Sequence, residues 1–494
     1  MNIPVARIDV LRQAEVAARL RQVLPRDAVL SAEEDTRAYE CDGLSAYRQL
    51  PMVVVLPSNE DEVRQVLLAC RGLKVPVTAR GAGTGLSGGA LPRGDGVLLS
   101  LGKMRRILAV DPVARIARVQ PGVTNLAISA AAKPYGLFYA PDPSSQIACS
   151  IGGNVAENSG GVHCLKYGLT VHNVLRARAV TIDGEIVEFG SEALDAPGLD
   201  LLALLVGSEG MLAVVTEVTV KLLPEPETAR VILASFDQLE KAGNAVADVI
   251  AAGIVPAGLE MMDRPAAQAV EEFVHAGYDL DAAALLLCES DGTPEEVDED
   301  IQRMREVLDR SGATRIRVSG SEAERLKFWA GRKAAFPAVG RISPDYYCMD
   351  GTIPRRRLGE VLLFIAQLEK KYGLRCPNVF HAGDGNLHPL ILFDANDPDQ
   401  LRRTELFAAE VLEKCVQVGG TVTGEHGVGI EKIDQMCVQF AQEEIVAFQG
   451  VKRAFDPHGL LNPGKNIPTL HRCAELGRMH VHAGNLPHPE LPRF

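Results

Sequence analysis

The sequence predicts an α+β protein with more than one domain, and three observations support this fold class. Its 494 residues are too many for one hydrophobic core, because chains longer than about 250–300 residues usually divide into domains. Short strand patterns bounded by Gly, Pro and Asp dominate residues 51–222. Beyond the linker-like stretch PEPE (224–227), strands alternate with longer helical patterns, which indicates a second α+β layer.

The first region divides into local units. Residues 1–47 are expected to form a helical arm, because LRQAEVAARLRQVL (11–24) carries apolar residues at helical spacing. MVVVLP (52–57), a helix that starts at SNEDE (58–62), and VPVTAR (75–80) predict a small βαβ unit. RILAVDPVARIARVQPG (106–122) and VLRARAVTIDGEIVEFG (174–190) predict hairpins, the second with a tight turn at Asp183-Gly184.

Composition excludes several classes of protein. The net charge of −13 argues against a nucleic-acid surface. The longest apolar runs, LLALLV (201–206) and AAALLLC (282–288), are far shorter than the ~20 residues that cross a bilayer. None of the ten cysteines lies in a C-x-x-C pair, which argues against an iron–sulfur cluster or a zinc ribbon and predicts reduced cysteines in a cytoplasmic protein.

The stretch VPVTARGAGTGLSGGALPRGDG (75–96) contains a formal G-x-G-x-x-G at Gly83, Gly85 and Gly88. A Rossmann fingerprint requires a helix directly after the glycines, and Pro92 prevents one here. The alternative is a loop whose backbone N–H groups converge on an anion, although a flexible surface loop would have the same composition.

Two further glycine-rich stretches favour the anion-binding loop. PDPSSQIACSIGGNVAENSGGVHCLKYG (141–168) and VGSEGMLAVVTEVTVKL (206–222) also combine small residues with hydrogen-bonding side chains. Three such loops among short strands predict one long ligand that lies across the domain.

HAGDGNLH (381–388) places two histidines seven residues apart, a spacing that suits neither one helix face nor one straight strand. Strand-like PNVF precedes His381, and strand-like HPLILF begins at His388, so a turn at Gly383 and Gly385 would bring the two imidazoles together. Histidine is the commonest metal ligand, and TVTGEHGVGIEK (421–432) supplies Glu425 beside His426.

Two histidines and a carboxylate suit a catalytic zinc site, and they suit nonhaem iron as well. The alternative to a metal site is that these histidines only form hydrogen bonds within their loops. In FWAGRKAAF (328–336), Arg332 offers a guanidinium that matches a substrate carboxylate, whereas Lys333 is expected to be a solvated charge.

Taken together, RGAGTGLSGGA (80–90), the stretch 141–168, GSEGMLAVVTEVTVKL (207–222) and FDPHGLLNPGK (455–465) resemble the vanillyl-alcohol-oxidase/PCMH flavoproteins over about residues 30–470. Within that family they resemble the FAD-linked branch that oxidises D-2-hydroxy acids. GRISPDYYCMDGTIPRR (340–356) and the histidine hairpin are most similar to the FAD-containing large subunits of bacterial glycolate oxidases.

The resemblance implies a PCMH-type FAD-binding domain of two α+β subdomains at 48–226. It also implies a ferredoxin-like α+β substrate domain at 227–467 whose end returns to the FAD domain, and a tail at 468–494. Members with covalent flavin carry a histidine in the first loop, where this chain has Thr84, so noncovalent FAD is expected. The implied FAD-binding residues are Arg80, Gly81, Ala82, Gly83, Thr84, Gly85, Gly88, Pro141, Asp142, Ser145, Gly152, Gly153, Asn154, Asn158, Gly160, Gly161, Tyr167, Gly168, Glu209, Gly210, Val214 and Asn462.

The resemblance also implies the roles of the remaining site residues. The metal ligands, expected to hold zinc or another divalent ion, are His381, His388 and Glu425. The catalytic residues are His426 as the base and Arg332 as the carboxylate clamp. Some relatives that oxidise larger acids carry Lys and Asn where this chain has Cys348 and Leu390, which argues against a second carboxylate on the substrate.

The implied reaction is FAD-dependent oxidation of a small D-2-hydroxy acid, glycolate or D-lactate, to the 2-oxo acid. The alternatives are a D-lactate or D-2-hydroxyglutarate dehydrogenase of the same family and a non-redox flavoenzyme of the same fold. Partners implied are a second FAD-type subunit and an iron–sulfur subunit that lead electrons to quinone. They would hold this cytoplasmic chain at the inner face of the membrane, with the tail 468–494 as a docking segment.

Overall fold

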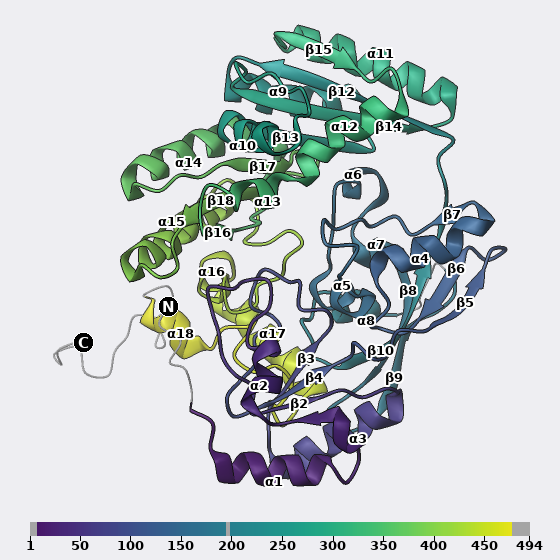
Figure 1. The fold of residues 1–494 in the computed structure, drawn as a ribbon, viewed down its shortest axis with the longest axis vertical. Helices are drawn as coiled ribbons and strands as arrows, with labels where there is room; N and C mark the ends of the chain where they lie inside the picture. Colours follow the sequence, from purple (N-terminus) through teal and green to yellow (C-terminus); the bar gives the residue numbers. More distant parts are fainter. Residues whose placement is uncertain (1–6, 194–197, 477–494) are drawn as a thin grey trace.

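The computed structural model describes residues 7–193 and 198–476, so most of the tail expected to dock a partner lies outside the described residues. The chain forms two units that lie one above the other (Figure 1). The lower unit carries two sheets, and the upper unit, called the cap below, carries one large sheet between helices.

The first sheet of the lower unit has four strands in the order β1 (Val29–Leu30), β2 (Val53–Val55), β4 (Val97–Ser100) and β3 (Val77–Arg80). β2 and β3 both run parallel to β4, and helix α3 (Glu60–Leu73) connects them, which confirms the predicted βαβ unit. Asn59 caps α3 by accepting from the Glu62 N–H, and Lys74 ends the helix in the left-handed conformation.

The N-terminal segment differs from the expected helical arm. Helix α1 (Val10–Leu20) forms as predicted, but β1 follows it and pairs antiparallel with β2. Val16, Ala17 and Leu20 are buried in the same hydrophobic core as the four-stranded sheet. The segment is therefore an integral layer of the lower unit, because its apolar face finds a partner in the sheet. Its short helical elements are η1 (Arg26–Ala28), α2 (Glu33–Thr36) and η2 (Arg37–Tyr39).

The second sheet of the lower unit has five antiparallel strands in the order β5 (Ile107–Asp111), β6 (Ile116–Val119), β10 (Val214–Lys221), β8 (Val174–Val180) and β9 (Ile186–Gly190). The pairs β5–β6 and β8–β9 confirm both predicted hairpins. A short pair of β7 (Leu137–Phe138) and β11 (Leu223–Pro224) lies beside it. The helices between these strands are α4 (Asn125–Ala132), η3 (Lys133–Tyr135), α5 (Ile151–Glu157), α6 (Cys164–Tyr167), α7 (Thr170–Asn173) and α8 (Leu201–Leu205).

The cap sheet has seven strands in the order β15 (Arg315–Val318), β12 (Thr228–Phe236), β14 (Ala284–Gly292), β13 (Gly258–Asp263), β17 (Asn378–His381), β18 (Asn386–Phe393) and β16 (Asp345–Cys348). β12 and β14 lie side by side between β13 and β15, which is the strand order of a ferredoxin-like unit. One face is covered by α9 (Leu239–Ala251), α11 (Pro294–Arg310), α14 (Leu358–Tyr372) and α15 (Pro398–Gln417). The other face is covered by α10 (Arg264–Val274), α12 (Glu322–Lys333) and α13 (Ala335–Val339).

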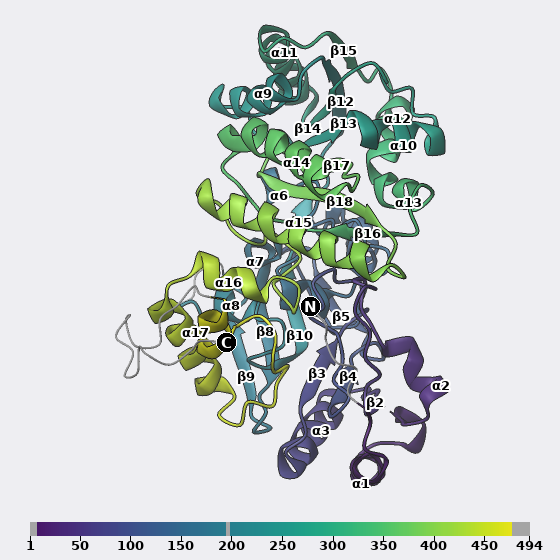
Figure 2. The same ribbon diagram turned by 90° about the vertical axis from the view of Figure 1, so that its left-hand side faces the viewer.

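The chain then returns to the lower unit through α16 (Ile433–Gln439) and α17 (Gln442–Phe455), whose yellow ribbon lies against the lower sheets in Figure 2. Leu461 forms a parallel bridge with Val77 beside β3. The expectation of reduced cysteines is wrong at one pair, because Cys437 in α16 and Cys473 in α18 (Leu470–Glu475) form a disulfide. None of the helices in the described ranges combines the length and apolar character that a membrane span requires.

Candidate functional site

A cavity of about 380 Å³ lies where the two units meet. All three predicted glycine-rich stretches contribute to its wall, which supports the prediction that they serve one ligand. The cap completes the wall with Lys333, Phe336, Pro337, His388, Glu425 and His426. Side chains from opposite ends of the sequence therefore face one enclosed space.

The first loop brings its backbone close to its neighbours. It follows β3 and does not continue into a helix, which agrees with the prediction that this is not a Rossmann motif. A Cβ added to Gly81 would lie 2.2 Å from Ser150 Oγ, and one added to Gly83, which has φ +73°, would lie 2.0 Å from the Arg80 guanidinium. Glycine is thus needed at both positions, and the exposed N–H groups with the buried Arg80 form an anion-binding cradle.

Most of the predicted cofactor-binding residues line the cavity. These are Arg80, Gly81, Ala82, Gly83, Thr84, Gly85, Ser145, Gly152, Gly153, Asn154, Glu209, Gly210 and Val214. The others lie behind the lining: Gly88, Pro141, Asp142, Asn158, Gly160, Gly161, Tyr167, Gly168 and Asn462.

The residues behind the lining hold the wall through contacts of their own. Asp142 Oδ2 lies 2.8 Å from His163 Nδ1, and the Tyr167 hydroxyl donates to Asp291 Oδ2 across the unit boundary at 2.7 Å. Asn462, buried at φ +44°, donates to two carbonyl groups of the wall. A one-dimensional motif cannot separate such residues from the lining, because both are adjacent to the same glycines.

Glu157, at the end of α5, is a cavity residue that the sequence did not single out. Its Oε2 is buried and makes no hydrogen bond with the described residues. Burial, with the carboxylates of Glu209 and Asp42 nearby, raises the pKa of Glu157 well above its usual range, and Lys432 and Lys465 only partly offset this. Nothing in the stretch of small residues around Glu157 indicated that its carboxyl would be buried without a hydrogen bond to Oε2.

The histidine hairpin forms as predicted. β17 and β18 pair so that Val379 lies opposite His388, and His381 opposite Asn386. His381 and His388 are therefore diagonal neighbours on one face, with ring centroids 4.8 Å apart. Gly385 has φ +82°, and a Cβ there would lie 2.1 Å from the Ile353 carbonyl oxygen, so the turn needs glycine.

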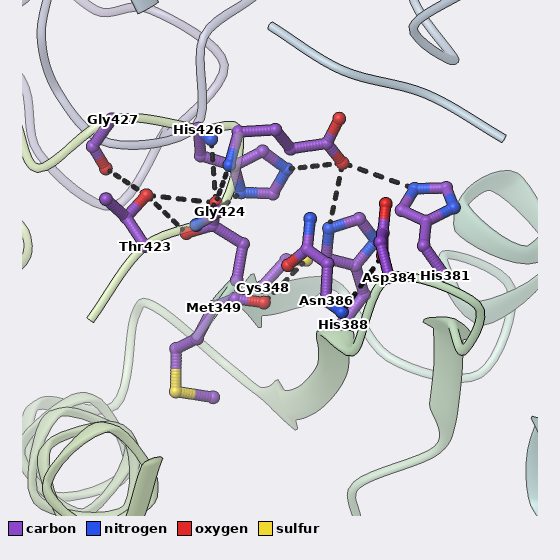
Figure 3. Close-up of polar contacts among 12 residues, drawn as sticks. Cys348, Met349, His381, Asp384, Asn386, His388, Thr423, Gly424, His426 and Gly427 are labelled. Carbon is purple, nitrogen blue, oxygen red and sulfur yellow. Dashed lines mark hydrogen bonds and ion pairs between the residues drawn. The ribbon is translucent and has the colours of Figure 1, made fainter. Parts of the chain in front are cut away.

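Glu425 contacts both histidines, whose rings are labelled in Figure 3. Its Oε1 lies 3.2 Å from His381 Nε2 and 3.1 Å from His388 Nε2. Ligand atoms of these three residues all lie within 4.8 Å of one another, and all three residues are buried. His388 Nδ1 has no hydrogen-bond partner among the described residues, and Nε2 faces the shared Glu425 oxygen. This donor set fits a divalent cation with nitrogen and oxygen ligands.

The electrostatics of the trio also fit a cation. Burial would lower the pKa of His381, but Glu260 and Glu425 outweigh it and raise the pKa well above the usual range. Burial lowers the pKa of His388 to about 4, so that its imidazole is neutral. The carboxylates that favour a proton on His381 would equally favour a metal ion in its place, since metal binding displaces protons from its ligands.

His426 lies on the cavity side of Glu425. Its ring stacks on that of His388, with centroids 4.9 Å apart and an interplanar angle of 12°. Nε2 is 4.0 Å from Glu425 Oε1, and Nδ1 is 3.8 Å from Asp350 Oδ1. Burial lowers the pKa of His426, although Asp350 and Glu425 oppose this, so the neutral imidazole that a base requires is favoured.

Arg332 lies at the C-terminal end of α12, 3% exposed. Its Nη2 is 2.8 Å from Glu260 Oε2, and Arg332 itself does not line the cavity. Lys333, expected to be a solvated charge, is exposed and also lines the cavity. The site thus has one buried and one exposed cation at the end of the same helix.

Two family models match the two units of the chain. The FAD binding domain model matches residues 51–190, and the model of the C-terminal domain of FAD linked oxidases matches residues 225–466. The chain is 63% identical to glycolate oxidase subunit GlcD of Escherichia coli K12, over 98% of this chain and 97% of the relative. The chain belongs to the FAD-linked oxidase family.

Other FAD-linked oxidases are similar over most of the chain. GlcD of Bacillus subtilis is 39% identical over 86% of this chain and 91% of the relative. A D-lactate dehydrogenase of Anaerostipes hadrus is 33% identical over 91% of this chain and 97% of the relative. The chain is thus an FAD-dependent oxidoreductase, as the family resemblance implied.

Solved structures of the FAD-linked oxidase fold confirm the predicted fold class. p-Cresol methylhydroxylase superimposes with a TM-score of 0.80 over 94% of this chain and 98% of that one, at 17% identity. Alkyldihydroxyacetonephosphate synthase gives a TM-score of 0.72 over 94% and 86%, also at 17% identity. At this identity the likeness concerns the PCMH-type fold alone.

Proposed function

We propose that this chain oxidises a small D-2-hydroxy acid, glycolate in the first place, to the 2-oxo acid with FAD as the electron acceptor. The observation that carries this proposal is the shared cavity, in which the glycine-rich loops face His388, Glu425 and His426. The identity of 63% to a glycolate oxidase subunit supports the choice of substrate class.

FAD is proposed to bind without a covalent bond. The cradle around Gly81, Gly83 and Arg80 suits its pyrophosphate, and the first loop contains no histidine that would form a flavin linkage. When bound, FAD supplies the two-electron chemistry by accepting hydride from the substrate Cα.

A divalent metal ion, zinc in the first place, is proposed to bind His381, His388 and Glu425. Their fit rests on the convergence of all three side chains, in which both His381 Nε2 and His388 Nε2 face Glu425 Oε1. A metal ion held there would supply Lewis-acid stabilisation of an alkoxide.

The protein's own residues bind the substrate and move its hydroxyl proton. Arg332 is proposed to bind the substrate carboxylate, because its Nε has no hydrogen-bond partner in the described part of the chain. His426 accepts the hydroxyl proton at Nε2, the nitrogen on the Glu425 side, while Nδ1 faces Asp350. Lys333 at the cavity wall adds positive charge that attracts the anionic substrate.

We infer a monocarboxylate substrate from two buried positions of the cap that do not themselves line the cavity. Cys348 and Leu390, where relatives for larger acids carry Lys and Asn, lie opposite each other on β16 and β18, and both are buried among apolar residues. A second substrate carboxylate would find no charged partner at this pair. This supports glycolate or D-lactate over D-2-hydroxyglutarate.

The electrons are proposed to leave through partner chains. The relative from E. coli is named as a subunit of glycolate oxidase, and no cysteine pair of this sequence has the C-x-x-C spacing of an iron–sulfur site. A second FAD-type subunit and an iron–sulfur subunit would carry electrons to quinone and hold this chain at the inner face of the cytoplasmic membrane.

The test is anaerobic flavin reduction with a panel of D-2-hydroxy acids. Glycolate and D-lactate should bleach the flavin absorbance, and D-2-hydroxyglutarate should react far more slowly. If D-2-hydroxyglutarate were preferred, the assignment of the pocket at Cys348 and Leu390 would fail. Bound FAD that no hydroxy acid reduces would instead support a non-redox flavoenzyme.

A further inference from the structure

We propose that Glu260 is a positioning residue that holds the metal ligand His381 and the carboxylate-binding Arg332 in one fixed arrangement. This inference rests on the proposed function and deepens it. Glu260 was not singled out by the sequence, and it is not among the residues that line the cavity.

Glu260 is a buried carboxylate with a different partner on each oxygen. It lies on β13 and is 1% exposed. Its Oε1 is 2.8 Å from His381 Nδ1, and its Oε2 is 2.8 Å from Arg332 Nη2. β13 pairs with β17 through Met261 and Phe380, which brings Glu260 beside His381 at the end of that ladder.

The contact with His381 decides which nitrogen can bind a metal. With Nδ1 hydrogen-bonded to Glu260, Nε2 points to Glu425, 3.2 Å away. A carboxylate behind a metal-binding histidine fixes the ring orientation and raises the basicity of the coordinating nitrogen. Glu260 therefore orients His381 for the ion that His388 and Glu425 would share.

The contact with Arg332 keeps a buried cation in place. A guanidinium that is 3% exposed requires a counter-charge, and Glu260 is the carboxylate that lies within 4 Å of it among the described residues. Arg332 Nε has no hydrogen-bond partner among the described residues, so this donor remains for a substrate carboxylate. One carboxylate thus sets the distance between the metal ligand and the substrate-binding group.

The cap contains a matched pair of contacts outside the site. Glu289 lies on β14, the strand next to β13, and is 2% exposed. Its Oε1 is 3.2 Å from His163 Nε2, and its Oε2 is 2.8 Å from Arg325 Nη1. Glu260 and Glu289 therefore share burial, sheet and partner types, but Glu260 alone of the two contacts a residue of the proposed metal site.

The experiment compares Glu260→Gln with Glu289→Gln in the full chain with FAD bound. Zinc affinity is measured by competition with a chelator of known affinity. KM and kcat are measured with glycolate as substrate and a dye as electron acceptor. Circular dichroism and flavin content show whether each variant folds. Glu260→Gln should weaken zinc binding about 10–100-fold and raise KM for glycolate. Glu289→Gln should keep zinc affinity within about twofold of the unaltered chain, even where its thermal stability or KM changes, because its contacts with His163 and Arg325 lie outside the proposed metal site.

Three outcomes would overturn the proposal. The first is a Glu260→Gln chain that binds zinc as tightly as the unaltered chain. The second is an equal loss of zinc affinity in Glu260→Gln and Glu289→Gln, since the effect would then be general destabilisation. If Glu260→Gln does not fold, Glu260→Asp replaces it and is judged in the same way. An unaltered chain that binds no zinc overturns this proposal and the metal site together, whereas zinc binding with no flavin reduction by any hydroxy acid contradicts the proposed function alone.

Discussion

Asp350 shows how one buried side chain orders a reactive segment. Its Oδ2 accepts hydrogen bonds from the backbone N–H groups of Gly424, Glu425 and His426, at 2.9, 2.7 and 2.7 Å. Lys432 Nζ lies 2.5 Å from Oδ1 and compensates its charge. Burial alone would raise the pKa of Asp350, but the charge of Lys432 and the hydrogen bonds from Lys432 and the Glu425 N–H outweigh it and hold the pKa far below its usual range. These hydrogen bonds fix the backbone of the turn, so that Glu425 can point to the proposed metal site while His426 serves as the proposed base.

The first residue-scale prediction separates those tasks. His381→Ala should lose zinc together with activity, because one of the three ligands is gone. His426→Asn should keep zinc and FAD but reduce the flavin ~10²–10⁴-fold more slowly, since only the base is missing. Metal analysis and stopped-flow flavin reduction check both variants, and a zinc-free His426→Asn with a zinc-loaded His381→Ala would reverse the assignment.

The second residue-scale prediction concerns Glu157, whose Oε2 has no hydrogen-bond partner among the described residues. Its pKa in the folded chain is raised above the unfolded value, so its contribution to stability is lost as pH rises through and above about 4.3. Glu157→Gln removes this penalty and should raise the free energy of unfolding of the flavin-free chain by about 1–3 kcal/mol, with a larger gain at pH 8 than at pH 5.

Glu209→Gln is the matched control for that prediction. Glu209 is also buried, but its oxygens accept from Val428 N, Gly429 N and Asn466 Nδ2. Its replacement should therefore destabilise the chain. Thermal unfolding at pH 5 and pH 8 measures both variants, and a Glu157→Gln chain that is less stable than the unaltered chain at pH 8 would show that Glu157 is ionised and paired.

At the scale of elements, the glycine-rich loops and α18 carry the next predictions. The loop after β3 approaches α5 closely, at Gly81 and Ser150, and offers no histidine for a covalent link. Acid precipitation of the yellow protein should therefore release the flavin into the supernatant. Colour that stays in the pellet after washing would contradict noncovalent binding.

The disulfide between Cys437 and Cys473 links α16 to α18 across 36 residues. The other eight cysteines are free, so denatured protein prepared without reductant should titrate eight thiols, and ten after reduction. Cys473→Ser should lower the free energy of unfolding by about 2–4 kcal/mol, because it removes this cross-link. Ten thiols before reduction would show that the pair stays reduced under those conditions.

At the scale of the whole molecule, the proposed reaction site lies where the two units meet. The glycine loops supply one wall of the cavity, and the cap supplies the other. Contacts such as Lys166 with Asp291 and His163 with Glu289 join the units beside it. Substrate oxidation therefore depends on the relative placement of the FAD-binding unit and the cap.

The electron route gives the last prediction. The isolated chain should reduce artificial dyes with glycolate but react slowly with oxygen, and partner subunits or membranes should increase quinone reduction. Steady-state assays with dye, oxygen and quinone measure the three routes. Rapid hydrogen peroxide formation by the isolated chain, with no gain from membranes or partners, would contradict the proposed partners.

The sequence by itself determined the features that depend on local chemistry. Turn residues and strand periodicity predicted the β17–β18 hairpin and the convergence of His381 and His388. Pro92 excluded a Rossmann helix, and the glycine-rich stretches indicated the walls of one cavity. Such features are readable because a turn, a strand or a close backbone approach limits which residues can occupy neighbouring positions.

Only the tertiary structure decided the features that depend on burial and on distant partners. Glu260 lies 121 residues before His381, and its role follows from the pairing of β13 with β17. Glu157 became distinctive because folding buried it without a partner, and Cys437 and Cys473 met because α18 packs beside α16. The physical reason is common to all: a carboxylate or a thiol takes its properties from the groups that folding brings within a few ångströms, and those groups are far away in the sequence.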